Sequence, residues 1–149
     1  MKSLIVIYSY HHNNTEKVAN VIAKVLDAEI KKPQEVKPEE FQKYELVGFG
    51  SGIYGEKHHK EIIELVDKLP QVTNKKAFIF STSALIDNAT KHKTLRKKLK
   101  SKGYLIVDEF SCKGLNTNSF MKFFGGMNKG RPNAKDLKKA EEFAQNLLM

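Results

Sequence analysis

Residues 5–19 read I-V-I-Y-S-Y-H-H-N-N-T-E-K-V-A, and this stretch is the most informative part of the chain. An apolar run rich in branched residues stops at Ser9, and a helical pattern begins at Asn14-Thr15 after a short polar loop. The first amides of a helix have no intrahelical partner, and the helix macrodipole adds partial positive charge there. A strand, a polar loop and a helix N-terminus in this order therefore predict an α/β protein that holds a phosphate group at the loop.

The loop differs from the two common nucleotide-binding loops. It lacks the glycines and the lysine of G-x-x-x-x-G-K-[ST], and it lacks the glycines of G-x-G-x-x-G. Side-chain donors would come instead from Ser9, His11, Asn14 and Thr15. A capped turn between a strand and a helix, with solvated histidines, would give the same pattern, so the phosphate site depends on whether other segments agree with it.

The same residues resemble the FMN-phosphate loop of flavodoxins, in which an aromatic residue ends the first strand and a Ser/Thr-rich loop closes on N-T-E. Tyr8, Ser9 and residues 14–16 match that pattern. Residues 10–13 depart from it, because the family usually has small hydroxyl residues and a glycine there. The resemblance implies a phosphate site made of Ser9, Tyr10, His11, His12, Asn13, Asn14 and Thr15.

Apolar strands and amphipathic helices continue to alternate along the chain. Strands are expected at residues 3–8, 28–30, 45–49, 76–80 and 104–110. Helices are expected at residues 14–27, 59–69 and 90–101 and after an Asn133 cap. This alternation predicts a mainly parallel sheet covered on both faces. Five strands with a phosphate loop after the first fit the doubly wound order 2-1-3-4-5 of the flavodoxin-like fold, in a single domain over residues 1–149.

Two further segments should meet the first loop, because the carboxyl ends of neighbouring parallel strands share one edge of the sheet. The third strand runs into a loop with the sequence G-S-G-I-Y-G at residues 50–55, and the fourth runs into S-T-S-A at residues 81–84. One segment offers flexible backbone and an aromatic face, and the other offers hydroxyls and amides. Together with a phosphate site, these groups outline a planar heterocycle that carries a phosphate.

The second segment also resembles flavodoxins, which often place an aromatic residue and a glycine there. The ring stacks on the isoalloxazine, and the adjacent peptide can flip to hydrogen-bond flavin N5. Tyr54-Gly55 matches that pair, although a tight turn with a surface tyrosine would look the same. The segment at 81–84 lacks the second stacking tyrosine of many flavodoxins. The resemblance implies that FMN also contacts Gly52, Ile53, Tyr54, Gly55, Ser81, Thr82, Ser83 and Ala84.

Composition limits the class of protein. The chain has 149 residues, of which 40% are hydrophobic and 29% are charged, as in an ordinary soluble domain. No apolar run approaches the roughly 20 residues that cross a bilayer, and the first strand begins too early for a signal peptide. Cys112 is the single cysteine, so it cannot form an internal disulfide and is expected as a buried apolar residue. A cytoplasmic protein without membrane attachment is expected.

Positive charge is concentrated in the second half of the chain. Residues 76–149 contain 15 Lys/Arg and 6 Asp/Glu, which accounts for the net charge of +9. Much of the excess lies between Lys91 and Lys102. Such a face could bind an acidic protein, an anionic substrate or a nucleic acid. A solvated helix surface is the preferred interpretation, and nucleic acid is not expected because no aromatic residues interleave with these lysines.

Two histidine pairs raise the question of a metal site. His11-His12 and His58-His59 are adjacent in sequence, and neighbouring side chains on a helix or strand point apart. No H-E-x-x-H or comparable spacing of ligands is present. The sequence therefore predicts no metal site.

The resemblance implies an FMN-binding redox protein that carries electrons between partner proteins, of which some could be acidic. The alternative is a small FMN-dependent reductase that passes electrons from NAD(P)H to a quinone or a similar small-molecule acceptor. A third hypothesis is a cofactor-free interaction module with the same fold. No catalytic residue is assigned, because the flavin would carry the chemistry and the protein would bind and orient it.

Overall fold

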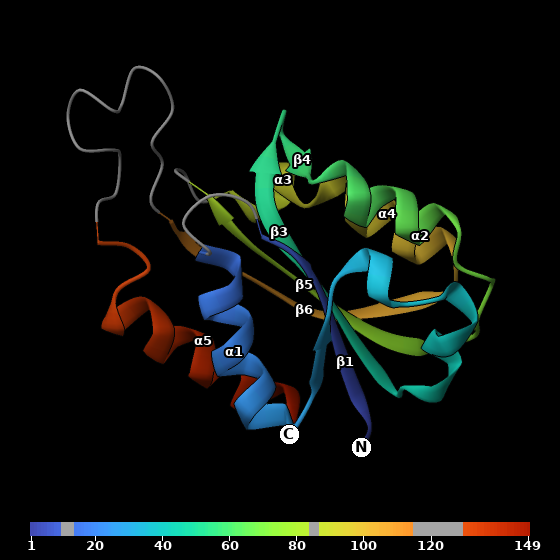
Figure 1. Cartoon of the computed structure of the whole chain (residues 1–149), viewed down its shortest axis with the longest axis horizontal. Helices are drawn as coiled ribbons and strands as arrows, with labels where there is room; N and C mark the ends of the chain where they lie inside the picture. Colours follow the sequence, from blue (N-terminus) through green and yellow to red (C-terminus); the bar gives the residue numbers. More distant parts are fainter. Residues whose placement is uncertain (10–13, 84–86, 115–129) are drawn as a thin grey trace.

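The computed structural model describes residues 1–9, 14–83, 87–114 and 130–149 (Figure 1). Its strands are β1 (Ser3–Tyr8), β2 (Glu29–Lys31), β3 (Leu46–Tyr54), β4 (Lys57–His58), β5 (Lys75–Ser83) and β6 (Tyr104–Lys113). Its helices are α1 (Asn14–Leu26), α2 (Lys60–Asp67), α3 (Asn88–Lys91), α4 (Lys93–Ser101) and α5 (Ala134–Leu147), with short 3-10 helices η1 (Pro33–Glu35) and η2 (Pro38–Lys43). No helix in these ranges is long and apolar enough to span a membrane.

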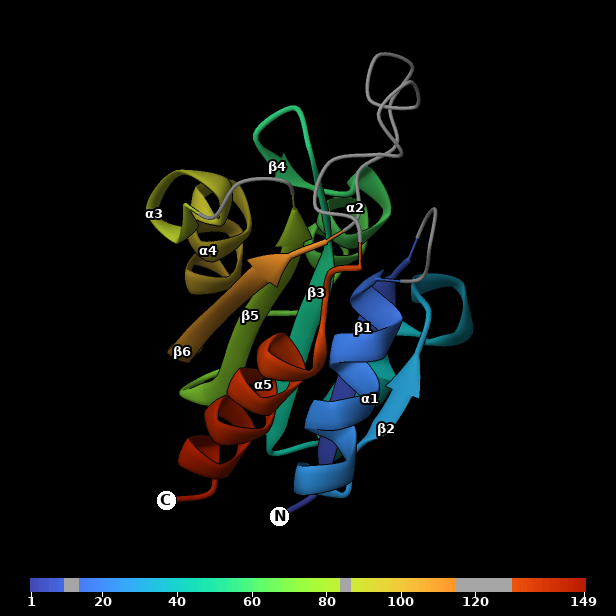
Figure 2. The same cartoon turned by 90° about the vertical axis from the view of Figure 1, so that its left-hand side faces the viewer.

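The sheet is doubly wound, as predicted. Its main path runs β2-β1-β3-β5-β6, and every pair along this path is parallel. Helices α1 and α5 cover one face, and α2 and α4 cover the other (Figures 1 and 2). The parallel strands follow the predicted order, but the sheet has six strands rather than five, because the short β4 pairs antiparallel with β3.

Three strands are longer than predicted, and each takes in the start of a segment that was expected as a loop. Gly50 to Tyr54 belongs to β3, residues 81–83 belong to β5, and residues 111–113 belong to β6. The prediction ended each strand where its apolar run ended. The ladders continue past that point because each neighbouring strand supplies backbone partners for the polar residues. The helix expected over residues 90–101 is also divided into α3 and α4, with His92 between them.

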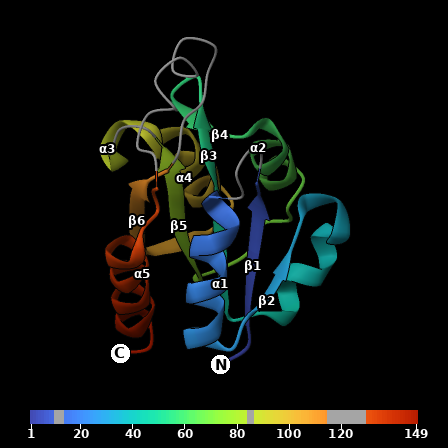
Figure 3. The same cartoon turned by 60° about the vertical axis from the view of Figure 1, so that its left-hand side comes forward.

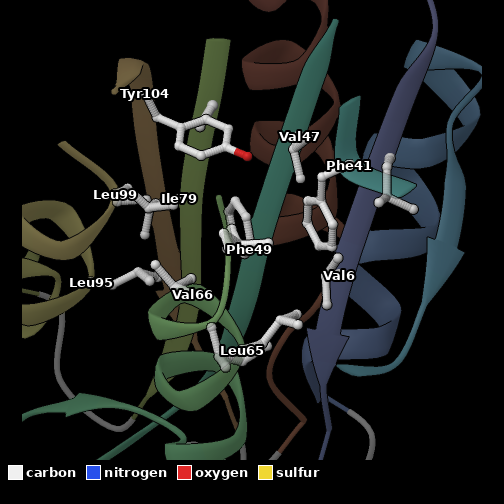
Figure 4. Packing of buried hydrophobic residues seen from close by; sticks show 14 of the residues in the cluster. Val6, Phe41, Val47, Phe49, Leu65, Val66, Ile79, Leu95, Leu99 and Tyr104 are labelled. Atoms are coloured by element: carbon white, nitrogen blue, oxygen red, sulfur yellow. The ribbon is translucent and has the colours of Figure 1, made fainter. Parts of the chain in front are cut away.

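The sheet face under α2 and α4 holds the larger apolar layer. Figure 4 shows Phe49 and Ile79 of the sheet with Leu95 and Leu99 of α4 beside Val66 of α2. All of these side chains are fully buried. Burying one such side chain contributes about 1.5–3 kcal/mol, so this layer fixes how the helices sit on the sheet.

The opposite face packs aromatic rings between the sheet and the pair α1 and α5. Phe78 stacks on Phe80 at 6.0 Å and meets Phe143 of α5 edge-on at 5.8 Å. Gly48 and Gly50 of β3 make room for these rings. A Cβ at Gly48 would lie 2.1 Å from the Phe78 ring, and a Cβ at Gly50 would lie 2.3 Å from the Phe80 ring.

A β-bulge halfway along β6 reverses which sheet face each later side chain of the strand points to. Ile106 pairs with Ala77 and Asp108 pairs with Phe78, so Val107 is an extra residue. In a regular ladder Glu109 would face α1 and α5, because successive side chains alternate. The bulge turns Glu109 toward α4, where it bonds Arg96.

The carboxyl ends of the parallel strands gather at one end of the molecule, together with the β3–β4 hairpin (Figure 3). The two termini lie at the opposite end (Figure 3). A site built from strand ends is therefore located at the hairpin end.

The contact between Gly48 and Phe78 generates a prediction about packing. Gly48→Ala should lower the free energy of unfolding by about 1–3 kcal/mol, because the new methyl group overlaps the ring. Phe78→Leu should also destabilise the protein, but the double variant should be less unstable than the sum of the two, because leucine leaves room for the methyl group. Urea unfolding measures all four proteins. If the two single losses of unfolding free energy add up to the loss in the double variant, the Phe78 ring does not limit the size of the residue at position 48.

Candidate functional site

Two segments far apart in sequence are joined by a pair of hydroxyl groups. Thr15, in the first turn of α1, is buried, and its Oγ1 lies 2.9 Å from Oγ1 of Thr82 at the end of β5. Thr82 in turn pairs with Gly52 across the β3–β5 ladder. The structure thus brings together one predicted residue from each of the three segments.

The first segment presents polar groups where the phosphate was predicted. Ser9 follows β1, and its Oγ is enclosed without a hydrogen-bond partner among the described residues. A buried hydroxyl without a partner costs about 1–3 kcal/mol, so this position fits a ligand oxygen. Asn14 begins α1, whose first-turn amides lack intrahelical partners. The predicted residues outside the described ranges are Tyr10, His11, His12, Asn13 and Ala84.

The second segment is a β-hairpin rather than a loop between a strand and a helix. Tyr54 pairs with Lys57 across the central residues Gly55 and Glu56, which have φ of 57° and 68°. Positive φ at both central residues defines a type I′ turn, which glycine adopts without strain. The hairpin tip is tied to α3, because Lys91 Nζ lies 2.7 Å from Glu56 Oε1.

An aromatic cluster stands beside this hairpin. The His59 ring stacks on Tyr8 with centroids 3.6 Å apart and meets Tyr54 edge-on at 5.1 Å. His59 also caps α2, because its Nδ1 accepts a hydrogen bond from the Glu61 amide at 3.1 Å. Tyr54 is 37% exposed, and its ring lies against Gly52, where a Cβ would come within 3.2 Å of the tyrosine hydroxyl. Tyr54 thus offers an accessible aromatic surface at the predicted position.

A row of hydroxyls crosses the sheet at the level where the apolar residues end. Tyr8, Ser51, Ser81 and Ser111 are consecutive partners across β1, β3, β5 and β6. Ser51 Oγ accepts a hydrogen bond from the His59 amide at 3.0 Å. This row, which we call the serine row, is the boundary between the apolar core and the site.

Two buried histidines lie next to the serine row. His58 is 1% exposed, and its Nε2 lies 2.9 Å from the Phe80 carbonyl oxygen. His92 is fully enclosed, and its Nε2 lies 2.7 Å from Ser81 Oγ. Burial lowers the pKa of His58 to about 3 and lowers the pKa of His92 as well. Both rings are therefore neutral at pH 7.

An ion pair anchors His92 from the other side. Its Nδ1 lies 2.8 Å from Glu109 Oε1, and Arg96 donates to both carboxylate oxygens of Glu109 at 2.6 and 2.7 Å. Burial alone would raise the pKa of Glu109, but hydrogen bonds from Arg96 and His92 lower it below its usual value. Glu109 is therefore a carboxylate in the folded protein.

The described residues offer neither a reactive cysteine nor a cluster of metal ligands. Cys112 is buried in β6, as predicted, and burial raises the pKa of its thiol to about 12, so it is not a reactive thiolate. Across the described ranges, no three His, Cys, Asp or Glu side chains gather as metal ligands.

Sequence reasoning missed His92, Arg96 and Glu109. His92 could have been found, because it shares the inward helical spacing of Leu95 and Leu99. Glu109 could not, because strand alternation without the bulge directs it to the other layer.

The buried neutral histidines generate a prediction about acid stability. The unfolded chain protonates His58 near pH 6.5 and the folded protein only near pH 3, so the unfolded state binds more protons between these values. Stability therefore falls as the pH falls, by up to about 1.4 kcal/mol per pH unit for this group. His58→Gln keeps a donor for the Phe80 carbonyl without titrating, so its unfolding free energy should fall less steeply in urea series from about pH 7 to pH 4. Parallel pH profiles would contradict a buried neutral ring.

Comparisons with known proteins identify the family of this chain. The model of a family described as flavodoxin domain matches residues 5–126. An uncharacterized protein of Methanocaldococcus jannaschii is 52% identical over 149 residues, which cover 99% of each chain.

Solved structures show the same fold. A flavodoxin from the domain Archaea superposes with a TM-score of 0.70 at 18% identity and covers 99% of this chain and 96% of its own. Oxidised flavodoxin 2 from Bacillus cereus superposes with a TM-score of 0.73 at 17% identity and covers 99% and 98%. The doubly wound sheet and the family match over residues 5–126 lead to one conclusion: this chain belongs to the flavodoxin family.

Proposed function

We propose that this protein binds FMN without covalent attachment at the carboxyl edge of its sheet and carries electrons between partner proteins. The observation that carries the proposal is the meeting of the start of α1 with the carboxyl ends of β3 and β5, in which Thr15 bonds Thr82 and Thr82 pairs with Gly52. The family match and the superposed flavodoxins support the same ligand. When bound, FMN supplies the redox chemistry, and the protein supplies binding, orientation and electrostatics.

The phosphate end would be held by the start of α1. Amides of the first turn and the Ser9 hydroxyl would donate to the phosphate oxygens. The pair Thr15–Thr82 can add a further donor. If Thr82 donates to Thr15, the Thr15 hydroxyl keeps its own hydrogen for the ligand, because a hydroxyl both donates and accepts.

The ring end would be held by the β3–β4 hairpin. The accessible Tyr54 ring would stack on the isoalloxazine, and His59 supports it from the side. The peptide that joins Tyr54 and Gly55 lies in a turn that already has positive φ at Gly55. Glycine tolerates both orientations of that peptide, so the hairpin can adjust its hydrogen bonding to the ring.

The charge distribution supports acidic partners. Lys93, Lys97 and Lys100 are exposed on α4. Exposed lysines attract an acidic protein over about 8–10 Å at physiological salt, and this attraction weakens as salt is added. The single buried thiol fits a reducing cytoplasm, which is the compartment we propose.

Loss of the Thr15 hydroxyl tests the phosphate site. Thr15→Val should weaken FMN binding roughly tenfold or more, because a hydrogen bond to a charged group contributes about 1.5–3 kcal/mol. Riboflavin, which lacks the phosphate, should bind the variant and the wild type about equally. Thr73→Val is the matched control, because Thr73 is exposed and precedes β5 at the other end of the sheet. Flavin fluorescence titration measures all affinities, and a wild type that binds FMN and riboflavin equally would exclude a dedicated phosphate site.

The carrier role makes a kinetic prediction. The FMN-loaded protein should oxidise NAD(P)H slowly with a quinone as acceptor, because a carrier needs no nicotinamide site of its own. Stopped-flow reduction and steady-state assays measure this rate. Turnover in the ordinary enzyme range, roughly 1–1000 per second, would identify a reductase instead.

A further inference from the structure

A buried chain of hydrogen bonds runs from Ser81 of the site to the charged surface of α4. Ser81 Oγ contacts His92 Nε2 at 2.7 Å, and His92 Nδ1 contacts Glu109 Oε1 at 2.8 Å. Arg96 closes the chain by donating to both oxygens of Glu109. Ser81 and His92 are 1% and 0% exposed, so water does not compete for these bonds.

The hydrogen-bonding chemistry of Glu109 determines which nitrogen of His92 carries the hydrogen and which way the Ser81 hydroxyl points. A carboxylate can only accept, so His92 Nδ1 must carry a hydrogen and donate to Glu109. In the neutral ring, Nε2 then has a free lone pair, and the Ser81 hydroxyl must donate to it. A second proton on the ring would reverse this bond, because Nε2 would donate and Ser81 would accept. The Ser81 hydrogen would then be released from His92.

We propose that the chain Ser81–His92–Glu109 is a protonation switch beneath the site. Proton binding at His92 Nε2 frees the Ser81 hydroxyl to donate elsewhere and adds a positive charge at the carboxyl edge of the sheet, so an anionic flavin nucleotide binds more tightly. The ligand part of this inference rests on the proposed function. His92 acts through Ser81 and through its charge, so it is a positioning residue.

His58 is not the switch, although its ring lies 4.9 Å from that of His92. Its Nε2 must donate to the Phe80 carbonyl, and its Nδ1 is enclosed without a hydrogen-bond partner among the described residues. A proton on Nδ1 would have no acceptor there. Glu109, in contrast, already offers His92 a negative charge.

The groups around His92 set the pH at which it responds. Burial lowers its pKa, Glu109 of β6 opposes that effect, and Arg96 of α4 adds to it. His58 of β4 stays neutral in this range, and Lys91 of α3 is paired with Glu56. His92 therefore takes up its second proton on the acidic side of the ordinary histidine range. A small change in nearby charge there alters the fraction of His92 that is protonated.

Proton binding and ligand binding must favour each other by the same factor. If the protonated protein binds FMN severalfold more tightly, bound FMN must raise the pKa of His92 correspondingly. The proposal can therefore be tested in two ways: by the effect of FMN on the titration of His92, and by the effect of pH on FMN affinity.

The first experiment follows the histidine rings of the full chain by nitrogen NMR, with and without FMN. In the free protein at neutral pH, His92 should be the Nδ1–H tautomer, and its titration should lie below that of an ordinary histidine. FMN should shift this titration upward by a severalfold change in proton affinity. Glu109→Gln should shift it downward, because the counter-charge is lost. An Nε2–H tautomer, or a His92 titration that FMN leaves unchanged, would overturn the switch.

The second experiment measures FMN affinity at about pH 5 and about pH 7.5. The phosphate of FMN also titrates in this range, so the comparison is between proteins with the same ligand. His92→Gln should lose the severalfold gain at low pH that the wild type shows, and Ser81→Ala, which keeps the charge, should retain part of it. If the FMN affinity of the wild type and of His92→Gln changes equally with pH, the switch is overturned but FMN binding is not. A wild type that does not bind FMN at either pH overturns the proposed function as well.

Discussion

The ladder between β3 and β5 runs in register from Leu46–Lys76 to Gly52–Thr82 and positions the other strands, the hairpin and the candidate site. It continues past the buried apolar runs that end at Phe49 and Phe80, so it carries the hydroxyl groups of Ser51, Ser81 and Thr82 into the interior. Buried hydroxyls need partners, and histidines and threonines from other elements provide them. Among the described residues, the part of the candidate site that β3 and β5 supply is consequently held by strands, which places its groups more precisely than loops would.

Ion pairs between elements account for part of the positive charge in the second half of the chain. Arg96 supports the buried chain through Glu109. Lys91 ties the hairpin tip through Glu56, and Lys98 pairs with Asp67, the last residue of α2. These cations join separate elements on one face of the sheet. Some of the lysines and arginines between Lys91 and Lys102 therefore hold neighbouring elements together. Others are exposed and can contact a partner protein.

Sequence reasoning predicted the features that follow from local pattern. The first strand and the first helix, the order of the parallel strands, the Asn133 cap and the burial of Cys112 were all confirmed, whereas residues 10–13 of the predicted loop lie outside the described residues. It failed where pairing overrides local pattern. The glycines and tyrosine of residues 50–54 look like a loop, yet β5 pairs with this segment as far as Gly52, and the positive φ at Gly55 and Glu56 then folds it into a hairpin. Whether the predicted residues bind FMN stays a prediction.

The bulge at Val107 bears on solubility as well as on the direction of Glu109. β6 ends the sheet, and Leu105 and Val107 on it are 48% and 43% exposed. An unbroken apolar edge is a template for pairing with another chain. A chain without Val107 would keep the facing of every other residue, because Ile106 and Asp108 would simply become neighbours in a regular ladder. It would also present a straight edge to a second molecule, so the extra residue makes this edge a poorer template for pairing with another chain, an effect separate from its contribution to folding stability.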